Sequence, residues 1–215
     1  MMTKFLDRRE AGQLLARKLS DYAGRDDVLV LALPRGGVPV AAEVAGILKV
    51  PMDVFVVRKL GLPGQPELAM GAIASGGVRV LNEAVLYALN VPTEVIDAVS
   101  AEEEHELKRR EHVYRHGRRP LNVEGKTVIV VDDGVATGST VLAAVAALRQ
   151  LNAARVVVAT PTIAMSTYHQ MGNHADEVVA VITPEDFFGV GQWYENFSQT
   201  TDAEVSELLS AKGPG

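Results

Sequence analysis

Residues 128–140 read VIVVDDGVATGST. The four apolar residues 128–131 have the composition of a strand that is buried on both faces. Two acids, Asp132 and Asp133, follow directly, and the small residues after them lead into an amphipathic segment. In open α/β sheets, ligands bind at the carboxyl ends of the strands. This order of residues therefore predicts a ligand site between a strand and the amino end of a helix.

The loop after the two acids is suited to a phosphate group. Residues 137–140 offer backbone N–H groups, hydroxyls and the positive end of a helix dipole, and Gly138 allows close approach of the backbone. Paired carboxylates can hold sugar hydroxyls or a divalent cation. The prediction is a ligand with both a phosphate and a diol. The alternative interpretation is a solvated turn followed by a helix N-cap. A Walker loop is excluded because no lysine follows the glycine.

Composition limits the protein class. The 215 residues include no cysteine, which excludes disulfides, thiolate metal sites and cysteine nucleophiles. The formal net charge is −6, so nucleic acid is not an expected partner. Hydrophobic residues make up 47% of the chain, but no apolar run approaches the ~18 residues that span a membrane, and we expect a cytoplasmic protein.

Valine-rich runs alternate with amphipathic segments, which predicts a three-layer α/β/α fold with a mostly parallel central sheet. We expect strands at 28–33, 52–57, 127–131, 155–160 and 177–182, and a hairpin formed by 70–75 and 78–82. Helices are expected at 8–23, 39–48, 83–89, 93–116 and 139–151, between the last two strands, and from about 201. Residues 60–66 hold two glycines and two prolines and are predicted to be irregular, as are residues 187–197.

The 128–140 motif resembles the phosphoribosyl-pyrophosphate (PRPP) motif of the type I phosphoribosyltransferases, except that Gly134 stands where an apolar residue is usual. The resemblance covers about residues 28–197. It implies one domain over 1–215, a helical insertion at about 83–120 and a base-binding hood at about 184–200. It also implies that Asp132 and Asp133 hold the ribose hydroxyls, and that the 5′-phosphate lies on Ala136, Thr137, Gly138, Ser139 and Thr140.

Two further segments are similar to the same family. The turn Pro34, Arg35, Gly36 and Gly37 resembles its pyrophosphate loop, which often contains a cis peptide, although alone it would be interpreted as a tight turn. Residues 57–63 resemble the entry to the mobile catalytic loop of adenine-type members. Arg58 and Lys59 would then bind pyrophosphate, and Glu67 would be a proton donor or acceptor, unless it is a plain surface residue.

The aromatic tail is the predicted hood. Phe187 and Trp193 are the candidates for stacking on a planar base, and the alternative is that they pack the tail onto the core. Oxopurine-type members commonly have an aspartate at the position of Ala136, so its absence disfavours that substrate class.

A basic cluster lies in the predicted insertion. It consists of Lys108, Arg109, Arg110, Arg115, Arg118 and Arg119. We interpret it as an exposed helix with salt-bridge pairing. The alternatives are an anion- or RNA-binding surface, or an oligomer contact.

The resemblance implies Mg²⁺-dependent transfer of phosphoribosyl from PRPP to a nitrogenous base, with release of pyrophosphate. Asp132, Asp133, Arg35 and Glu67 would be catalytic, with Mg²⁺ at the two aspartates directly or through ribose hydroxyls or water. A homodimer or higher homo-oligomer is expected. Two alternatives remain: a non-catalytic regulatory protein that binds PRPP or a nucleotide on the same fold, and a phosphohydrolase that uses the acid pair.

Overall fold

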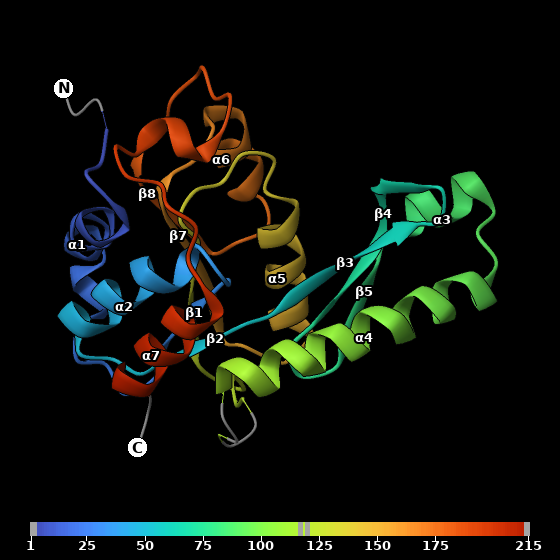
Figure 1. The fold of residues 1–215 in the computed structure, drawn as a ribbon, viewed down its shortest axis with the longest axis horizontal. Coiled ribbons are helices and arrows are strands. Elements are labelled where there is room, and N and C mark those ends of the chain that lie inside the picture. Colours follow the sequence, from blue (N-terminus) through green and yellow to red (C-terminus); the bar gives the residue numbers. More distant parts are fainter. Residues whose placement is uncertain (1–3, 116–117, 119–120, 213–215) are drawn as a thin grey trace.

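The computed structural model of the chain describes residues 4–115, 118 and 121–212. Its main sheet has five parallel strands in the order β2-β1-β6-β7-β8. Helices cover both sides of this sheet (Figure 1). The strands are β1 (Val28–Ala32), β2 (Met52–Val54), β6 (Thr127–Val131), β7 (Arg155–Thr162) and β8 (Glu177–Ile182).

Alternate strand residues enter two apolar cores. In β1, Val28 and Val30 pack into one core, and Leu29 and Leu31 into the other, because successive side chains of a strand point to opposite faces. The first core includes residues of α1 (Arg8–Lys18), α2 (Gly37–Leu48) and α7 (Asp202–Lys212). The second includes residues of α5 (Ser139–Gln150) and α6 (Met165–Met171). The predicted three-layer α/β/α fold is confirmed.

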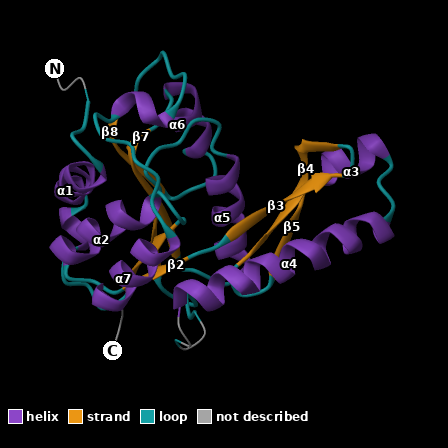
Figure 2. Cartoon of the chain, in the orientation of Figure 1, coloured by secondary structure: helices purple, strands orange, loops and turns teal. Residues whose placement is uncertain are grey.

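Between β2 and β6 in the sequence, the chain forms an arm that projects from the body made by the main sheet and its helices (Figure 2). This arm consists of an antiparallel sheet, β3-β4-β5, and two helices. Its elements are β3 (Val57–Leu62), β4 (Gln65–Ala74), β5 (Val78–Leu81), α3 (Glu83–Leu89) and α4 (Thr93–Arg115). Helix α4 brings the chain back to the body, where Leu107 and Tyr114 enter the first core.

Several element boundaries match the sequence predictions. The strands at 127–131 and 177–182 and the helix at 83–89 have the predicted ends. The hairpin across Gly76 and Gly77 is present, and both glycines have positive φ. The aromatic tail is irregular apart from the short η2 (Val190–Trp193).

Other boundaries were wrong. Residues 60–66, predicted to be irregular, form the β3–β4 hairpin. Shifts in strand register on either side of Gly61 accommodate it, and a Cβ at Gly61 would lie 2.8 Å from the Pro66 carbonyl oxygen. The strand predicted at 52–57 ends at Val54, because Val57 begins the sheet of the arm. Helix α1 stops at Lys18, before η1 (Ser20–Tyr22), and α2 begins at Gly37 rather than at residue 39. His116 lies outside the described residues.

Candidate active site

The candidate site lies where the direction of the sheet connections reverses. Strands β1 and β6 are neighbours. The chain continues from β1 toward β2 at one side of the sheet, and from β6 toward β7 at the other. Such a switch point opens a crevice at the carboxyl ends of the two strands, the usual ligand site of open α/β sheets. The turn at residues 34–37 and the loop at residues 132–138 both begin there.

The 34–37 turn is pressed against the end of β6. A Cβ at Gly36 would lie 2.0 Å from Oδ2 of Asp133, and one at Gly37 would lie 2.5 Å from the Val131 carbonyl oxygen. An added Cβ would collide with the Asp133 side chain at Gly36 and with the backbone of β6 at Gly37. The Pro34–Arg35 peptide bond is cis, as the resemblance implied. Two turns that are distant in sequence are thus brought into direct contact.

The two acids differ in their surroundings. Nε and Nη2 of Arg8 each lie 2.8 Å from Oδ2 of Asp133, and the Asp133 side chain is only 12% exposed. Asp132 is half-buried, and its Oδ1 accepts a hydrogen bond from the Asp133 backbone N–H at 2.9 Å. Burial raises the pKa of the Asp132 carboxyl, and the adjacent Asp133 carboxylate raises it further. When both acids are ionised, the charge of Asp133 is balanced by Arg8, and the charge of Asp132 is balanced less by its neighbours.

The loop that follows has the form of an anion cradle. Gly138 is the N-cap of α5 and has φ +73°, and a Cβ there would lie 2.9 Å from Cγ2 of Thr167. The Thr167 hydroxyl donates to the Ala136 carbonyl at 2.5 Å and fixes the loop from α6. Thr137 and Ser139 are exposed, with their hydroxyl oxygens 3.2 Å apart. Exposed hydroxyls at the positive end of a helix suit a phosphate.

Two of the predicted pyrophosphate ligands have carboxylate partners. Arg35 lies 3.6 Å from Asp202 of α7, and Arg58 lies 2.6 Å from Glu103 of α4. Either guanidinium would have to exchange its carboxylate for phosphate oxygens. Lys59 differs from both, because it has no ion pair within the described part of the chain and its side chain is exposed.

Lys59 lines a cavity of about 550 Å³ between the arm and α5. Ser139, at the start of α5, lines the same cavity, so Lys59 and one residue of the predicted phosphate loop face one hollow. The side chain of Glu67 lies outside the described residues, although its backbone belongs to β4.

The segment predicted to be the hood packs against the acid-pair loop at Gly134. A Cβ at Gly134 would lie 2.4 Å from Cγ1 of Val190, so the glycine at this unusual position lets η2 pack closely. The rings of Phe187 and Trp193 lie 6.2 Å apart. Trp193 also packs against the small core formed by Phe5, Ala11 and Tyr194. Trp193 therefore serves core packing at least in part.

Sequence reasoning missed the residues on other segments whose side chains hold the site loops in place. Arg8 binds Asp133, Thr167 fixes the phosphate loop, and the Tyr194 hydroxyl donates to the Asp133 carbonyl at 2.5 Å. Arg8 and Asp133 are 125 positions apart. No local sequence pattern around either residue indicates the other as its partner, so the pairing could be found only from the folded structure.

Comparison with known proteins agrees with this geometry. Residues 64–195 match the family model described as the phosphoribosyl transferase domain. Two Mycobacterium tuberculosis proteins, MT0597 and Rv0571c, are named as candidate phosphoribosyl transferases and are each 48% identical to this chain over 208 residues. Those residues are 97% of this chain and 47% of each relative, so the chain spans about half the length of the relatives.

A solved structure has the same fold over nearly the whole chain. The protein TT1426 from Thermus thermophilus is 40% identical, with a TM-score of 0.88, over 98% of this chain and 100% of that one. The fold and the site define an α/β protein with an anion cradle at a sheet switch point. The chain belongs to the phosphoribosyl transferase domain family. Within residues 4–115, 118 and 121–212, no helix has the length and apolar character needed to cross a membrane.

Proposed function

We propose that the protein transfers a 5-phosphoribosyl group from PRPP to a nitrogenous acceptor and releases pyrophosphate. One observation carries the proposal: at the carboxyl ends of β1 and β6 the two-glycine turn lies directly against the acid pair, and a Cβ at Gly36 would lie 2.0 Å from Oδ2 of Asp133. Two consecutive glycines let a phosphate approach the backbone of the turn closely, and the acid pair is suited to the diol of a ribose.

Each part of the ligand has matching groups. The 5′-phosphate would lie on the loop from Ala136 to Thr140, and the ribose hydroxyls at Asp132. The pyrophosphate would lie on the turn at residues 35–37, with Arg58 and Lys59 supplied by the arm. Breaking the bond at C1 leaves positive charge on the sugar, which a fixed carboxylate such as Asp132 stabilises.

Magnesium fits this donor set. Within the described residues, no group of three or more His, Asp or Glu side chains is arranged to hold a metal ion. Mg²⁺ is usually held by one or two carboxylates together with substrate phosphates. Asp132, with Asp133 beside it, would hold an ion that arrives with PRPP. The ion would neutralise the charge of the departing pyrophosphate.

The acceptor is proposed to bind under the hood. Phe187 is not part of the core that Trp193 joins, so it is the better candidate for stacking on a planar base. We keep the cytoplasmic location and the homo-oligomeric state as predictions from the sequence.

The test is release of pyrophosphate from PRPP and MgCl₂ with a panel of purine, pyrimidine and pyridine bases. We expect release with at least one base, and its loss in Asp132→Asn. The control is Asp26→Asn, because Asp26 is exposed and precedes β1, at the amino end of the sheet. PRPP binding without release for any base would instead favour a regulatory protein on the same fold. Release of inorganic phosphate from simple phosphate esters would favour a phosphohydrolase.

A further inference from the structure

We infer that Arg8 is a positioning residue for the acid pair, and that it makes the two acids unequal: Asp133 is held by Arg8, and Asp132 is left to the ligand. This inference rests on the proposed function. It concerns a residue of α1 that lies outside the family match and far in sequence from every motif of the site.

All three guanidinium nitrogens of Arg8 have partners. Nε and Nη2 lie 2.8 Å from Oδ2 of Asp133, and Nη1 donates to the Ser198 carbonyl at 2.7 Å. The guanidinium carbon lies 4.1 Å from the centre of the Phe197 ring. The Arg8 side chain is only 11% exposed, so water screens this ion pair poorly.

The position of Arg8 is set by the residues just before α1 and by the aromatic tail. Asp7 caps α1 by accepting the N–H groups of Arg9 and Glu10. Just before it, Phe5 donates its N–H to the Trp193 carbonyl at 2.8 Å and accepts the N–H of Glu195 at 2.8 Å. These bonds fix the start of α1 beside the tail, so Arg8 links the hood segment to the acid pair.

The negative charge of PRPP explains why the ion pair between Arg8 and Asp133 matters for binding. PRPP is a polyanion, and two adjacent carboxylates repel it. Arg8 cancels the charge of Asp133 where salt and water do so poorly. It also holds Oδ2 against the 34–37 turn, where a Cβ at Gly36 would lie only 2.0 Å from that oxygen. Without Arg8, Asp133 would be a buried carboxylate that has lost its ion pair and is no longer held in place beside the 34–37 turn.

The test is calorimetric titration of PRPP in MgCl₂ into four proteins, each first shown to be folded by its thermal unfolding. They are the wild type, Arg8→Gln, Arg8→Lys and Arg9→Gln. We expect Arg8→Gln to bind PRPP about 10–100-fold more weakly, the range typical for loss of a side chain that holds a neighbouring site residue in place. Arg8→Lys keeps the positive charge but loses the guanidinium that contacts Asp133 through two nitrogens, and should bind PRPP more tightly than Arg8→Gln but more weakly than the wild type. Arg9→Gln is the matched control, since Arg9 follows in the same helix and pairs with Glu43 at the surface.

A double mutant shows whether Arg8 acts through Asp133. Residues that act as one unit are not additive. We therefore expect Arg8→Gln with Asp133→Asn to bind PRPP like Asp133→Asn alone. Wild-type affinity in a folded Arg8→Gln, or losses that multiply in the double mutant, would overturn the inference. Absence of PRPP binding in the wild type would instead overturn the proposed function. If Arg8→Gln does not fold, Arg8→Lys takes its place in both comparisons.

Discussion

Single contacts at the sheet switch point define the site. Gly36 and Gly37 lie where any side chain would collide with the end of β6, and Gly138 has a positive φ at the start of α5. These glycines are visible in the sequence, and their motifs predicted both loops. The partners that hold the loops, Arg8 and Thr167, carry no such signal. They are ordinary residues of helices that only the fold brings to the site.

Gly36→Ala tests the contact between the two loops. The backbone at Gly36 has φ −59°, so alanine introduces no backbone strain, and the three atoms nearest to the added Cβ all belong to the Asp133 carboxyl group, with Oδ2 at 2.0 Å. We expect destabilisation of about 1–3 kcal/mol and at least tenfold weaker PRPP binding, measured by thermal unfolding and calorimetry.

Gly172→Ala is the matched control. Gly172 has φ −59° as well, and a Cβ there would have ordinary contacts at 3.5 and 3.8 Å. Equal losses in the two variants would show that the contact with Asp133 is not the cause.

At the scale of elements, ion pairs join the arm to the body. Arg115 at the end of α4 lies 2.9 Å from Asp53 of β2, and both side chains are nearly buried. Sequence patterns predicted α3 and α4, and for α4 the signal is local, because its charge pairs lie four residues apart. Sequence patterns failed for the β3–β4 hairpin, because its pairing depends on register shifts around Gly61 that no local pattern encodes.

Asp53→Ala is expected to lower the free energy of unfolding by about 1.5–3 kcal/mol, because it removes the charged hydrogen bonds between this carboxylate and the guanidinium of Arg115. Urea unfolding measures the loss. Asp97→Ala removes an exposed partner of Arg79, 58% exposed, and should cost less than ~1 kcal/mol. A loss for Asp53→Ala as small as that of the control would mean that this pair does not hold the arm.

Tyr114 gives a pH prediction for the α4–α7 contact. Its hydroxyl donates to Asp202 at 2.8 Å, and burial raises the pKa of Tyr114 from its usual 10.0 to about 12. Above pH 10 the unfolded chain loses this proton while the folded chain keeps it. The contribution to stability is therefore complete below pH 10 and falls as the pH rises toward 12.

The measurement is the free energy of unfolding at several pH values for the wild type and Tyr114→Phe. The stability difference between them should shrink between pH 10 and pH 12. A difference that stays constant across this range would contradict the assigned contact.

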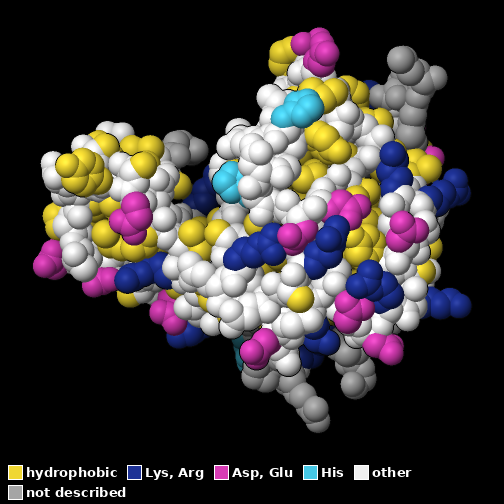
Figure 3. All heavy atoms as spheres, turned by 180° about the vertical axis from the view of Figure 1, so that it is seen from behind, with side chains coloured by type: hydrophobic (Ala, Val, Ile, Leu, Met, Phe, Trp, Pro, Cys, Tyr) yellow, Lys and Arg dark blue, Asp and Glu magenta, His cyan; other side chains and the backbone are white. Residues whose placement is uncertain are grey.

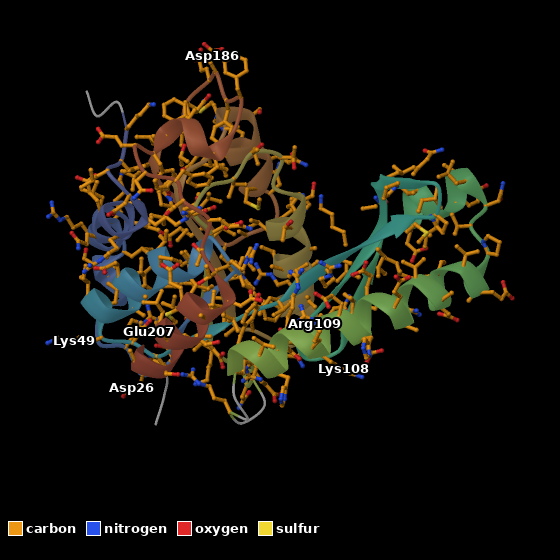
Figure 4. All side chains as sticks on the ribbon, in the orientation of Figure 1. Asp26, Lys49, Lys108, Arg109, Asp186 and Glu207 are labelled. Carbon is orange, nitrogen blue, oxygen red and sulfur yellow. The ribbon has the colours of Figure 1, made fainter. Side chains whose placement is uncertain are left out.

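At the scale of the whole molecule, the net charge is −6, and positive and negative side chains are interspersed on the surface (Figure 3). Figure 3 shows dark blue and magenta side chains side by side on one face, rather than a patch of one sign. Of the basic cluster, Lys108 pairs with Glu104, Arg109 and Arg110 pair with Glu106, and Arg118 donates to the Leu209 carbonyl. Arg119 lies outside the described residues. Figure 4 labels Lys108 and Arg109 on α4, away from Asp186 in the loop that follows β8.

We therefore expect no nucleic-acid binding by this cluster. In fluorescence anisotropy at physiological salt, a labelled single-stranded RNA should show no saturation up to about 10 µM protein. Salt-dependent binding below about 1 µM that is lost in Lys108→Glu would show that the cluster is an RNA surface after all.

The central claim is that PRPP binds at the carboxyl ends of β1 and β6, through Asp132 and the loop from Ala136 to Thr140. Calorimetric titration of PRPP in MgCl₂ tests it most directly. We predict saturable binding at one site per chain, at least a tenfold loss of affinity in Asp132→Asn, and no change in Asp26→Asn, at the opposite edge of the sheet (Figure 4). No heat of binding in the wild type, or the same affinity in Asp132→Asn, would contradict the claim.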